Sequence, residues 1–220
     1  DWSSDVCSSD LTVRAGVVRR LLSGDGVVSR WVGADLLAAG ETDPRVLSNL
    51  LEGLADIDAD RAFLPWIRTC LDHPHHRVRA AAAEGLIRLS GDSGDIETGL
   101  RSLSGMSRSA DPIKRAAAIA VLGRLQHESF FDELTSGLSD PDERVAGQAI
   151  AALRRLPLPE TGQVLKTAAE TLPKHLAPEA EAAAQAIEML TCRGISQVVE
   201  TLDPAERAQV VSRLGTWRHD

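Results

Sequence analysis

The sequence predicts an all-α fold, an α-α superhelix of stacked helical hairpins, and three observations support this prediction. First, 43% of the 220 residues are hydrophobic but only 3% are aromatic, so small and aliphatic side chains must form the core. Second, helix-forming residues such as Ala, Leu, Arg and Glu dominate the sequence, whereas strand-forming residues are scarce. Third, one apolar pattern with a helical period recurs along the chain.

The recurring pattern is clearest in three segments. They are DHPHHRVRAAAAEGLIRL (72–89), ADPIKRAAAIAVLGRL (110–125) and SDPDERVAGQAIAALRRL (139–156). In each, a proline stands three residues before an arginine, and an Ala-rich amphipathic run follows and ends in Leu. The arginines Arg77, Arg115 and Arg144 are 38 and 29 residues apart, which lies within the loose range of two-helix repeats.

The sequence also marks where these helices begin. Asp111 and Asp140 are placed to accept hydrogen bonds from the free N–H groups of a first helical turn, and the proline after each suits the first helical position. A shorter apolar segment precedes two of the copies and is expected to form the first helix of each hairpin. These segments are FLPWIRTCL (63–71) and FFDELTSGL (130–138).

Weaker copies of the pattern extend the array in both directions. Upstream they cover 13–22, 27–39 and 44–57, and downstream 160–172, 178–190, 196–202 and 204–214. Short loops that contain Gly, Asp or Pro separate the helices and mark no boundary between domains. We therefore expect one solenoid of about six hairpins over residues 12–214, followed by a tail at 215–220.

The pattern D-P-x-x-R followed by A-x-x-A-x-x-x-L resembles HEAT repeats, particularly the short repeats of bacterial HEAT-like and bilin-lyase-type proteins. The resemblance covers nearly all of residues 12–214 and is most specific in the three central copies. It implies that the first helices lie on the convex side of the superhelix and that the second helices line a concave groove. It also implies a structural ladder between repeats, formed here by Asp111, Asp140, Arg77, Arg115 and Arg144.

The first eleven residues, DWSSDVCSSDL, differ from the rest because they show no helical period. They resemble the in-frame translation of a common sequencing-library adapter, as in an untrimmed metagenomic read, and a disordered polar tail is the alternative. On the adapter interpretation residues 1–11 are not native, and further sequence is expected upstream of residue 12. Leaving out the three aspartates of this segment changes the formal charge from −8 to −5.

The sequence contains no pattern that indicates catalysis. It has no Gly-rich phosphate loop, no nucleophile elbow and no zinc-ligand spacing. The three cysteines are scattered and odd in number, which argues against a disulfide framework and favours a reducing, cytoplasmic setting. No apolar run approaches the roughly 18 residues of a membrane helix. We therefore expect no enzymatic activity, no cofactor and no membrane insertion.

The most conspicuous polar cluster is Asp72-His73-Pro74-His75-His76. Imidazoles and a carboxylate so close together suit a transition metal, but adjacent residues at a helix start point away from one another. A polar turn between helices is the favoured interpretation, and metal binding by His73–His76 is left open. Cys70, two residues upstream, lies on an apolar helix face and is expected to be a buried core thiol.

These features favour a non-enzymatic scaffold that binds a protein or peptide partner in the concave groove of the array. Arginines on the second helices make part of that groove cationic and suited to an acidic partner, although an ordinary solvated helix face is the alternative. The candidate partner-binding residues are Arg79, Arg88, Arg124, Arg154 and Arg155. Trp31 and Trp217 are candidate interface anchors, whereas Trp66 is expected in the core.

Two other functions remain open from the sequence. The chain could be an accessory module of a larger polypeptide whose N-terminal part is missing. It could also be a HEAT-like enzyme of the DNA glycosylase or bilin lyase type. The net charge of −8 disfavours nucleic acid as a partner, because a DNA-binding groove is expected to be basic and rich in aromatic residues.

Overall fold

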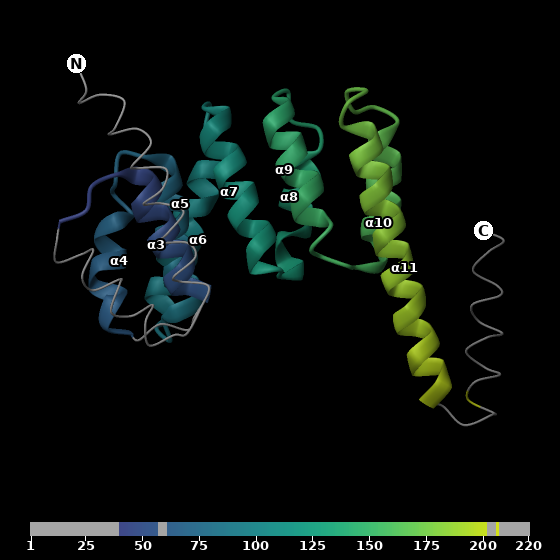
Figure 1. Cartoon of the computed structure of the whole chain (residues 1–220), viewed down its shortest axis with the longest axis horizontal. Helices are drawn as coiled ribbons and strands as arrows, with labels where there is room; N and C mark the ends of the chain where they lie inside the picture. The colour runs from purple at the N-terminus through teal and green to yellow at the C-terminus, as the bar shows by residue number, and fades with distance from the viewer. Residues whose placement is uncertain (1–39, 57–60, 202–205, 207–220) are drawn as a thin grey trace, which may run out of the picture. The chain divides into compact units, whose positions relative to one another are not determined.

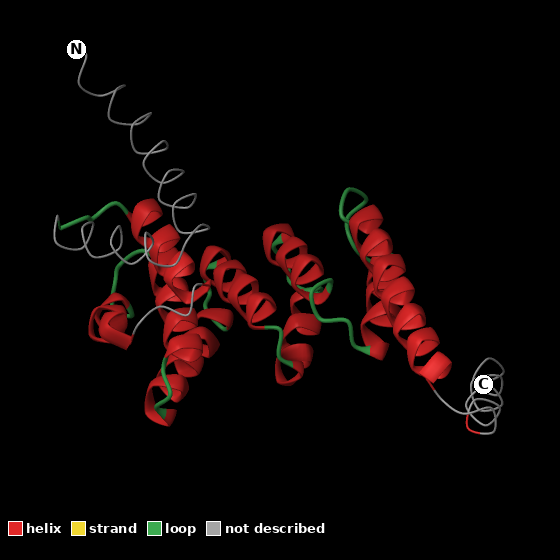
Figure 2. Ribbon diagram, turned by 60° about the horizontal axis from the view of Figure 1, so that its bottom comes forward, coloured by secondary structure: helices red, strands yellow, loops and turns green. Residues whose placement is uncertain are grey.

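The computed structural model describes residues 40–56, 61–201 and 206, and every regular element within these ranges is a helix. Figure 2 shows the described helices joined by loops, with no strand among them. The prediction of an all-α fold is therefore confirmed. The predictions made for residues 1–39 and for residues beyond 201, which include the helix at 204–214, the tail at 215–220, Trp31 and Trp217, lie outside the described residues apart from residue 206.

The chain divides into two compact units, one ending at Leu125 and the other beginning at Gln126. The described helices of the N-terminal unit are α3 (Pro44–Asp56), the 3-10 helix η1 (Arg61–Phe63), α4 (Leu64–Cys70), α5 (His76–Leu89), α6 (Ser93–Ser107) and α7 (Pro112–Leu125) (Figure 1). Those of the C-terminal unit are the 3-10 helix η2 (Glu128–Phe130), α8 (Phe131–Gly137), α9 (Glu143–Leu153), α10 (Pro159–Ala169) and α11 (Ala177–Thr201).

Helix α5 is the centre of the N-terminal unit, because it packs against α3, α4, α6 and α7. Its buried face is rich in alanine, which lets the neighbouring helices approach closely, and larger side chains fill the space between them. The largest of these, Leu50, Leu54, Ile67 and Leu86, are almost completely buried. Trp66 is half-buried against the same cluster, at the edge of the core.

Gly99 marks a place where α6 approaches α5 most closely. A Cβ atom added at Gly99 would lie 2.9 Å from the carbonyl oxygen of Ala83 and 2.9 Å from Cγ1 of Ile87. Contacts this short require backbone or core side chains to move, so the absence of a side chain at Gly99 permits the observed distance between the two helices.

Helix starts follow the predicted template in one copy and depart from it in another. Asp111 accepts a hydrogen bond from the backbone N–H of Ile113 at 2.9 Å, and Pro112 is the first residue of α7. The prediction that Asp140 caps a helix is wrong by two residues, because Asp142 is the N-cap of α9. The backbone of Asp142 is extended, and its side chain accepts a hydrogen bond from the N–H of Arg144. Pro141 therefore lies before the first residue of the helix.

The C-terminal unit contains two helix pairs, α8 with α9 and α10 with α11, and α9 also contacts α11. Separate helices were predicted at 178–190 and 196–202, but α11 is one continuous helix. No proline interrupts the connecting segment, and a single Gly194 costs a helix only about 1 kcal/mol. Cys192 lies within α11.

A charged hydrogen bond joins α4 to α6 on the outside of the N-terminal unit. The guanidinium group of Arg68 donates to both carboxylate oxygens of Asp95, at 2.8 and 2.7 Å, and the hydroxyl of Ser90 donates to the same carboxylate at 2.7 Å. The bonds from Arg68 and Ser90 stabilise the charged form and lower the pKa of Asp95 to about 2.

Two substitutions on α6 test the close packing at Gly99. We expect Gly99→Ala to lower the free energy of unfolding by about 1–3 kcal/mol, because the added methyl group overlaps α5. Gly105 has nothing within 4 Å of an added Cβ, so Gly105→Ala should instead raise it by roughly 0.5–1 kcal/mol. Urea unfolding followed by circular dichroism measures both values, and equal effects at the two positions would contradict the close contact.

The lowered pKa of Asp95 makes its contribution to stability depend on pH. An unfolded Asp titrates near 3.9, so the contribution is fully present above about pH 4 and is lost as the pH falls toward about 2. Asp95→Asn should lower the free energy of unfolding near neutral pH by about 1 kcal/mol, as for a partly exposed pair. The same variant should also show a smaller loss of stability between about pH 4 and about pH 2, measured by thermal unfolding at several pH values. Parallel curves for wild type and variant would show that the bond contributes nothing.

Candidate binding face on α3, α5 and α7

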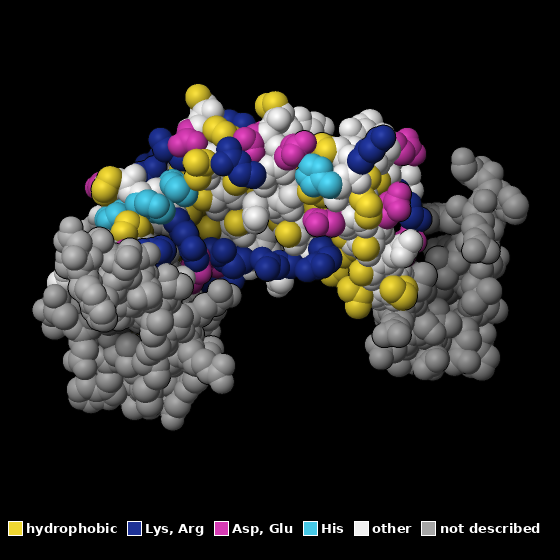
Figure 3. All heavy atoms as spheres, turned by 45° about the horizontal axis from the view of Figure 1, so that its top comes forward, with side chains coloured by type: hydrophobic (Ala, Val, Ile, Leu, Met, Phe, Trp, Pro, Cys, Tyr) yellow, Lys and Arg dark blue, Asp and Glu magenta, His cyan; other side chains and the backbone are white. Residues whose placement is uncertain are grey.

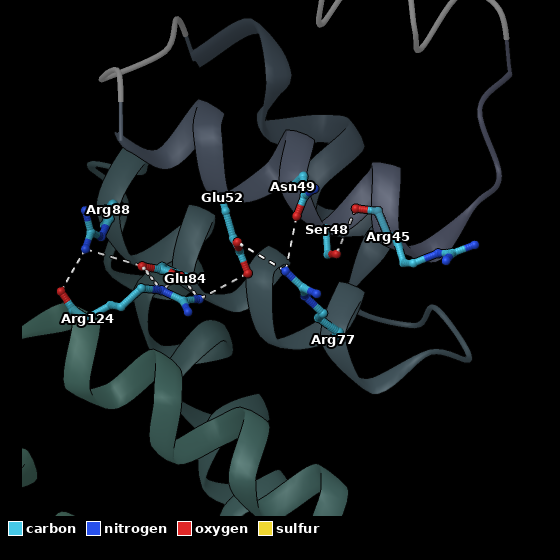
Figure 4. Close-up of polar contacts among 8 residues, drawn as sticks. All are labelled: Arg45, Ser48, Asn49, Glu52, Arg77, Glu84, Arg88 and Arg124. Carbon is cyan, nitrogen blue, oxygen red and sulfur yellow. Dashed lines mark hydrogen bonds and ion pairs between the residues drawn. The ribbon is translucent and has the colours of Figure 1, made fainter. Parts of the chain in front are cut away.

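A buried carboxylate lies at the centre of a charged network on the N-terminal unit (Figure 4). The side chain of Glu84 on α5 is only 2% exposed. Arg124 on α7 binds it with two nitrogen atoms: Nε lies 2.9 Å from Oε2 and 3.1 Å from Oε1, and Nη2 lies 2.5 Å from Oε2. This fork-like geometry joins the two helices through a single ion pair.

Arg88 makes a second contact with the same carboxylate, one helical turn further along α5. Its Nη2 atom lies 3.3 Å from Oε1 of Glu84 and donates a hydrogen bond to the backbone carbonyl of Arg124 at 2.7 Å. That carbonyl belongs to the last turn of α7, where carbonyl groups have no partner within the helix. Arg88 therefore neutralises Glu84 and also satisfies the end of α7.

Helix α3 extends the network on the other side of α5. Oε1 of Glu52 lies 3.6 Å from Nη2 of Arg124, and Oε2 lies 3.7 Å from Nη2 of Arg77. The same nitrogen of Arg77 donates to the side-chain oxygen of Asn49 at 3.1 Å. Side chains from three helices thus meet on one face, which we call the second-helix face, and Figure 4 shows them pointing toward one another.

The predicted partner-binding arginines fall into three groups. Arg88 and Arg124 belong to the network on the second-helix face. Arg79 is half-buried and donates to the carbonyls of His73 and Pro74, so it holds the turn before α5. Arg154 and Arg155 are exposed at the end of α9, in the C-terminal unit.

The predicted ladder residues have different partners from one repeat to the next. Arg77 reaches another helix, α3, as a ladder residue would. Arg115 instead donates to the carbonyls of Ser109 and Ala110, at 2.9 and 3.0 Å, in the turn before its own helix. These are the contacts that Arg79 makes before α5, so Arg79 is the structural counterpart of Arg115, and the alignment of Arg77 with Arg115 was wrong.

Arg144 also contacts its own helix start. Its Nε and Nη2 atoms lie 3.0 and 2.8 Å from the two carboxylate oxygens of Asp142, the N-cap of α9. In the structure Arg144 follows its N-cap Asp142 by two residues, as Arg77 follows the N-cap His75, although the two arginines have different partners.

Sequence reasoning missed Glu84, Glu52 and Asn49. A signal was present for Glu84, because it interrupts the run AAAAEGLIRL on the buried face and precedes Arg88 by four residues, the spacing of a helical ion pair. The signal for Glu52 and Asn49 is absent from the sequence, since both matter only through contacts with Arg77 and Arg124 on other helices.

The histidine turn has hydrogen bonds that explain its composition. Nδ1 of His73 accepts from the backbone N–H of His75 at 3.0 Å, and Nδ1 of His75 accepts from the N–H of Arg77 at 3.3 Å. Within the described residues, no group of three or more His, Cys, Asp or Glu side chains is arranged to hold a metal ion. Cys70 is buried, and burial raises the pKa of its thiol to about 11, which disfavours the reactive thiolate.

Removing one partner of the buried ion pair should destabilise the chain strongly. We expect Arg124→Met to lower the free energy of unfolding by about 3 kcal/mol, because Glu84 would keep only its weaker contact with Arg88. Adding Glu84→Leu should recover most of this loss, because no buried charge then remains. The measurement is urea unfolding followed by circular dichroism.

The matched control is Arg101→Ala on α6, which removes an arginine that is 71% exposed and paired with Glu97. It should change the free energy of unfolding by about 0.5 kcal/mol or less. If the double variant with Arg124→Met and Glu84→Leu were as unstable as Arg124→Met alone, burial of the unpaired Glu84 charge would not be the cause of the lost stability.

Comparisons with known proteins place part of this fold in a family. A family profile described as HEAT repeats matches residues 100–188, which contain α7 to α10. No curated protein matches the sequence significantly. No described helix is long and apolar enough to cross a membrane.

Two solved structures illustrate the likeness. One is a crystal structure of an engineered protein, with 18% sequence identity and a TM-score of 0.46, covering 80% of this chain and 89% of that chain. The other is human deoxyhypusine hydroxylase in complex with glycerol, with 15% identity and a TM-score of 0.41, covering 81% of this chain and 80% of that chain. The family similarity of this chain is therefore to HEAT repeats, over residues 100–188.

Proposed function

We propose that the chain is a non-enzymatic scaffold that binds a protein or peptide partner on the second-helix face of α3, α5 and α7. One observation carries this proposal: three arginines on that face are held in place by neighbouring side chains and still reach solvent. The exposed fractions of the Arg77, Arg88 and Arg124 side chains are 44%, 31% and 29%. The match of residues 100–188 to a HEAT-repeat profile supports a scaffold, because repeat stacks build extended binding surfaces.

Arginine side chains held in this way suit protein recognition. A free arginine loses much rotamer freedom when it binds, whereas Arg124 and Arg88 are already ordered by Glu84. Arginine can donate two parallel hydrogen bonds to a carboxylate, and it is enriched among the residues that dominate binding energy. Order and partial exposure together favour a role in binding beyond the structural ion pair.

The charge of the face favours an acidic partner. Among the described residues of this face, three arginines meet two carboxylates, those of Glu52 and Glu84. Glu84 is buried beneath the arginines, so a partner would meet mainly guanidinium groups. In the C-terminal unit, Arg154 and Arg155 are also exposed.

Fluorescence anisotropy with two labelled peptides of equal length, one rich in Glu and one rich in Lys, tests the proposal. We expect the Glu-rich peptide to bind more tightly, and its affinity to fall when salt is raised from about 50 to about 300 mM. Arg77→Ala should weaken its binding about three- to tenfold. Arg77 is the best site for this change, because Arg88 and Arg124 also neutralise Glu84 and would alter stability.

Arg101→Ala is the control for this experiment, since it removes one positive charge from α6 and leaves the second-helix face unchanged. It should leave the affinity for the Glu-rich peptide unaltered. Equal binding of the two peptides, or equal weakening by Arg77→Ala and Arg101→Ala, would contradict the proposal.

A further inference from the structure

Five of the described helices, α3, α5, α6, α7 and α9, begin with the same arrangement of two successive hydrogen bonds. Before α9, the Asp140 carboxylate accepts a hydrogen bond from the Asp142 N–H at 2.9 Å, and the Asp142 carboxylate accepts one from the Arg144 N–H at 3.0 Å. Before α7, the hydroxyl of Ser109 accepts from the Asp111 N–H at 3.2 Å, and Asp111 accepts from the Ile113 N–H at 2.9 Å. Each arrangement satisfies N–H groups that a helix start leaves without partners.

The turn before α5 uses histidine in both of these positions. His73 takes the place of Asp140 and Ser109, and His75 takes the place of the N-cap aspartate. A neutral imidazole accepts a hydrogen bond at Nδ1 only while that nitrogen carries no proton. Carboxylates keep their acceptors down to about pH 4 and hydroxyls keep theirs throughout, but an imidazole titrates near neutral pH.

We propose that the His73–His75 turn is a pH-sensitive cap, whose protonation in mildly acidic solution releases the first turn of α5 and destabilises the N-terminal unit. Protonation at Nδ1 would place an N–H against the backbone N–H that it now binds, so the hydrogen bond is lost and a repulsion replaces it. Both capping bonds end in the same way, because both acceptors are Nδ1 atoms.

The surroundings of His75 and His76 favour the neutral form of these two rings. Burial lowers the pKa of His75, and the nearby His73, Arg77 and Arg79 act in the same direction, while Asp43 acts against them. Burial also lowers the pKa of His76, which stacks on His75 with ring centroids 4.4 Å apart. The other groups facing His76 are Asp111, Arg79 and Lys114, and only Asp111 favours its protonation.

Figure 3 shows histidine side chains lying together on the surface beside Lys and Arg side chains.

A group whose pKa is lower in the folded chain contributes stability that is fully present above its unfolded pKa. For histidine that value is about 6.5, so the loss should begin there and continue as the pH falls through the lowered pKa.

The other described histidines differ from this turn. His127 also accepts a backbone N–H, that of Ser129, but the element that it caps is the three-residue η2. His175 is exposed, and its Nε2 atom lies 3.5 Å from a carboxylate oxygen of Glu143. His175 therefore serves as a control histidine in the other unit.

Thermal unfolding of the full chain at about pH 7.5 and about pH 5 tests the proposal. We expect the midpoint of the wild type to fall by about 5 °C between the two, since a cap contributes measurably to a domain of this size. The double variant with His73→Asn and His75→Asn has acceptors that do not titrate. Its thermal midpoint should fall by less than half as much between the two pH values. His175→Asn should behave like the wild type.

Two further measurements keep the proposal testable if the Asn variant is unstable. His73→Asp with His75→Asp copies the arrangement before α9 and should also reduce the pH dependence. In the wild type, the amide proton of Arg77 should shift with the His75 ring in an NMR titration as its hydrogen bond is lost. The same pH dependence in the wild type and both double variants, or an Arg77 amide that does not respond to pH, would overturn the proposal.

Discussion

The buried carboxylate of Glu84 determines how the helices of the second-helix face fit together. A charge among close-packed alanines is costly unless opposite charges and hydrogen bonds compensate it, so α7 must present Arg124 at that position. Arg88 then binds both Glu84 and the end of α7, which ties the last turn of one helix to the other. The relative register of α5 and α7 therefore depends on this single carboxylate.

The same contacts connect stability with the proposed binding role. Arg88 and Arg124 are ordered because they neutralise Glu84, and this order makes them suitable for recognition. Substitution of either residue therefore changes folding and binding together. Arg77 differs, because its partners Glu52 and Asn49 remain partly exposed when it is removed. Charge on the face can be altered at Arg77 without leaving a buried charge unpaired.

The sequence predicted the features that depend on neighbouring residues and missed those that depend on distant ones. The all-α fold, the α4–α5 pair and the Asp111 cap follow from local period and helix-start chemistry. The Asp140 cap was misplaced because the template contains a second aspartate, Asp142, and proline alone does not decide which one caps the helix. The network around Glu84 required three helices to be placed in space, which no spacing in the sequence expresses.

Helix α5 shows how a change at a helix start can reach the core. Val78 lies in the first turn of α5 and is completely buried, so this turn cannot fray without exposing an apolar side chain. The network residues Glu84 and Arg88 lie on the same helix, and α5 is in contact with every other α-helix described in its unit. A weakened cap at His75 should therefore lower the stability of the unit as a whole, because the first turn of α5 is part of the packed core.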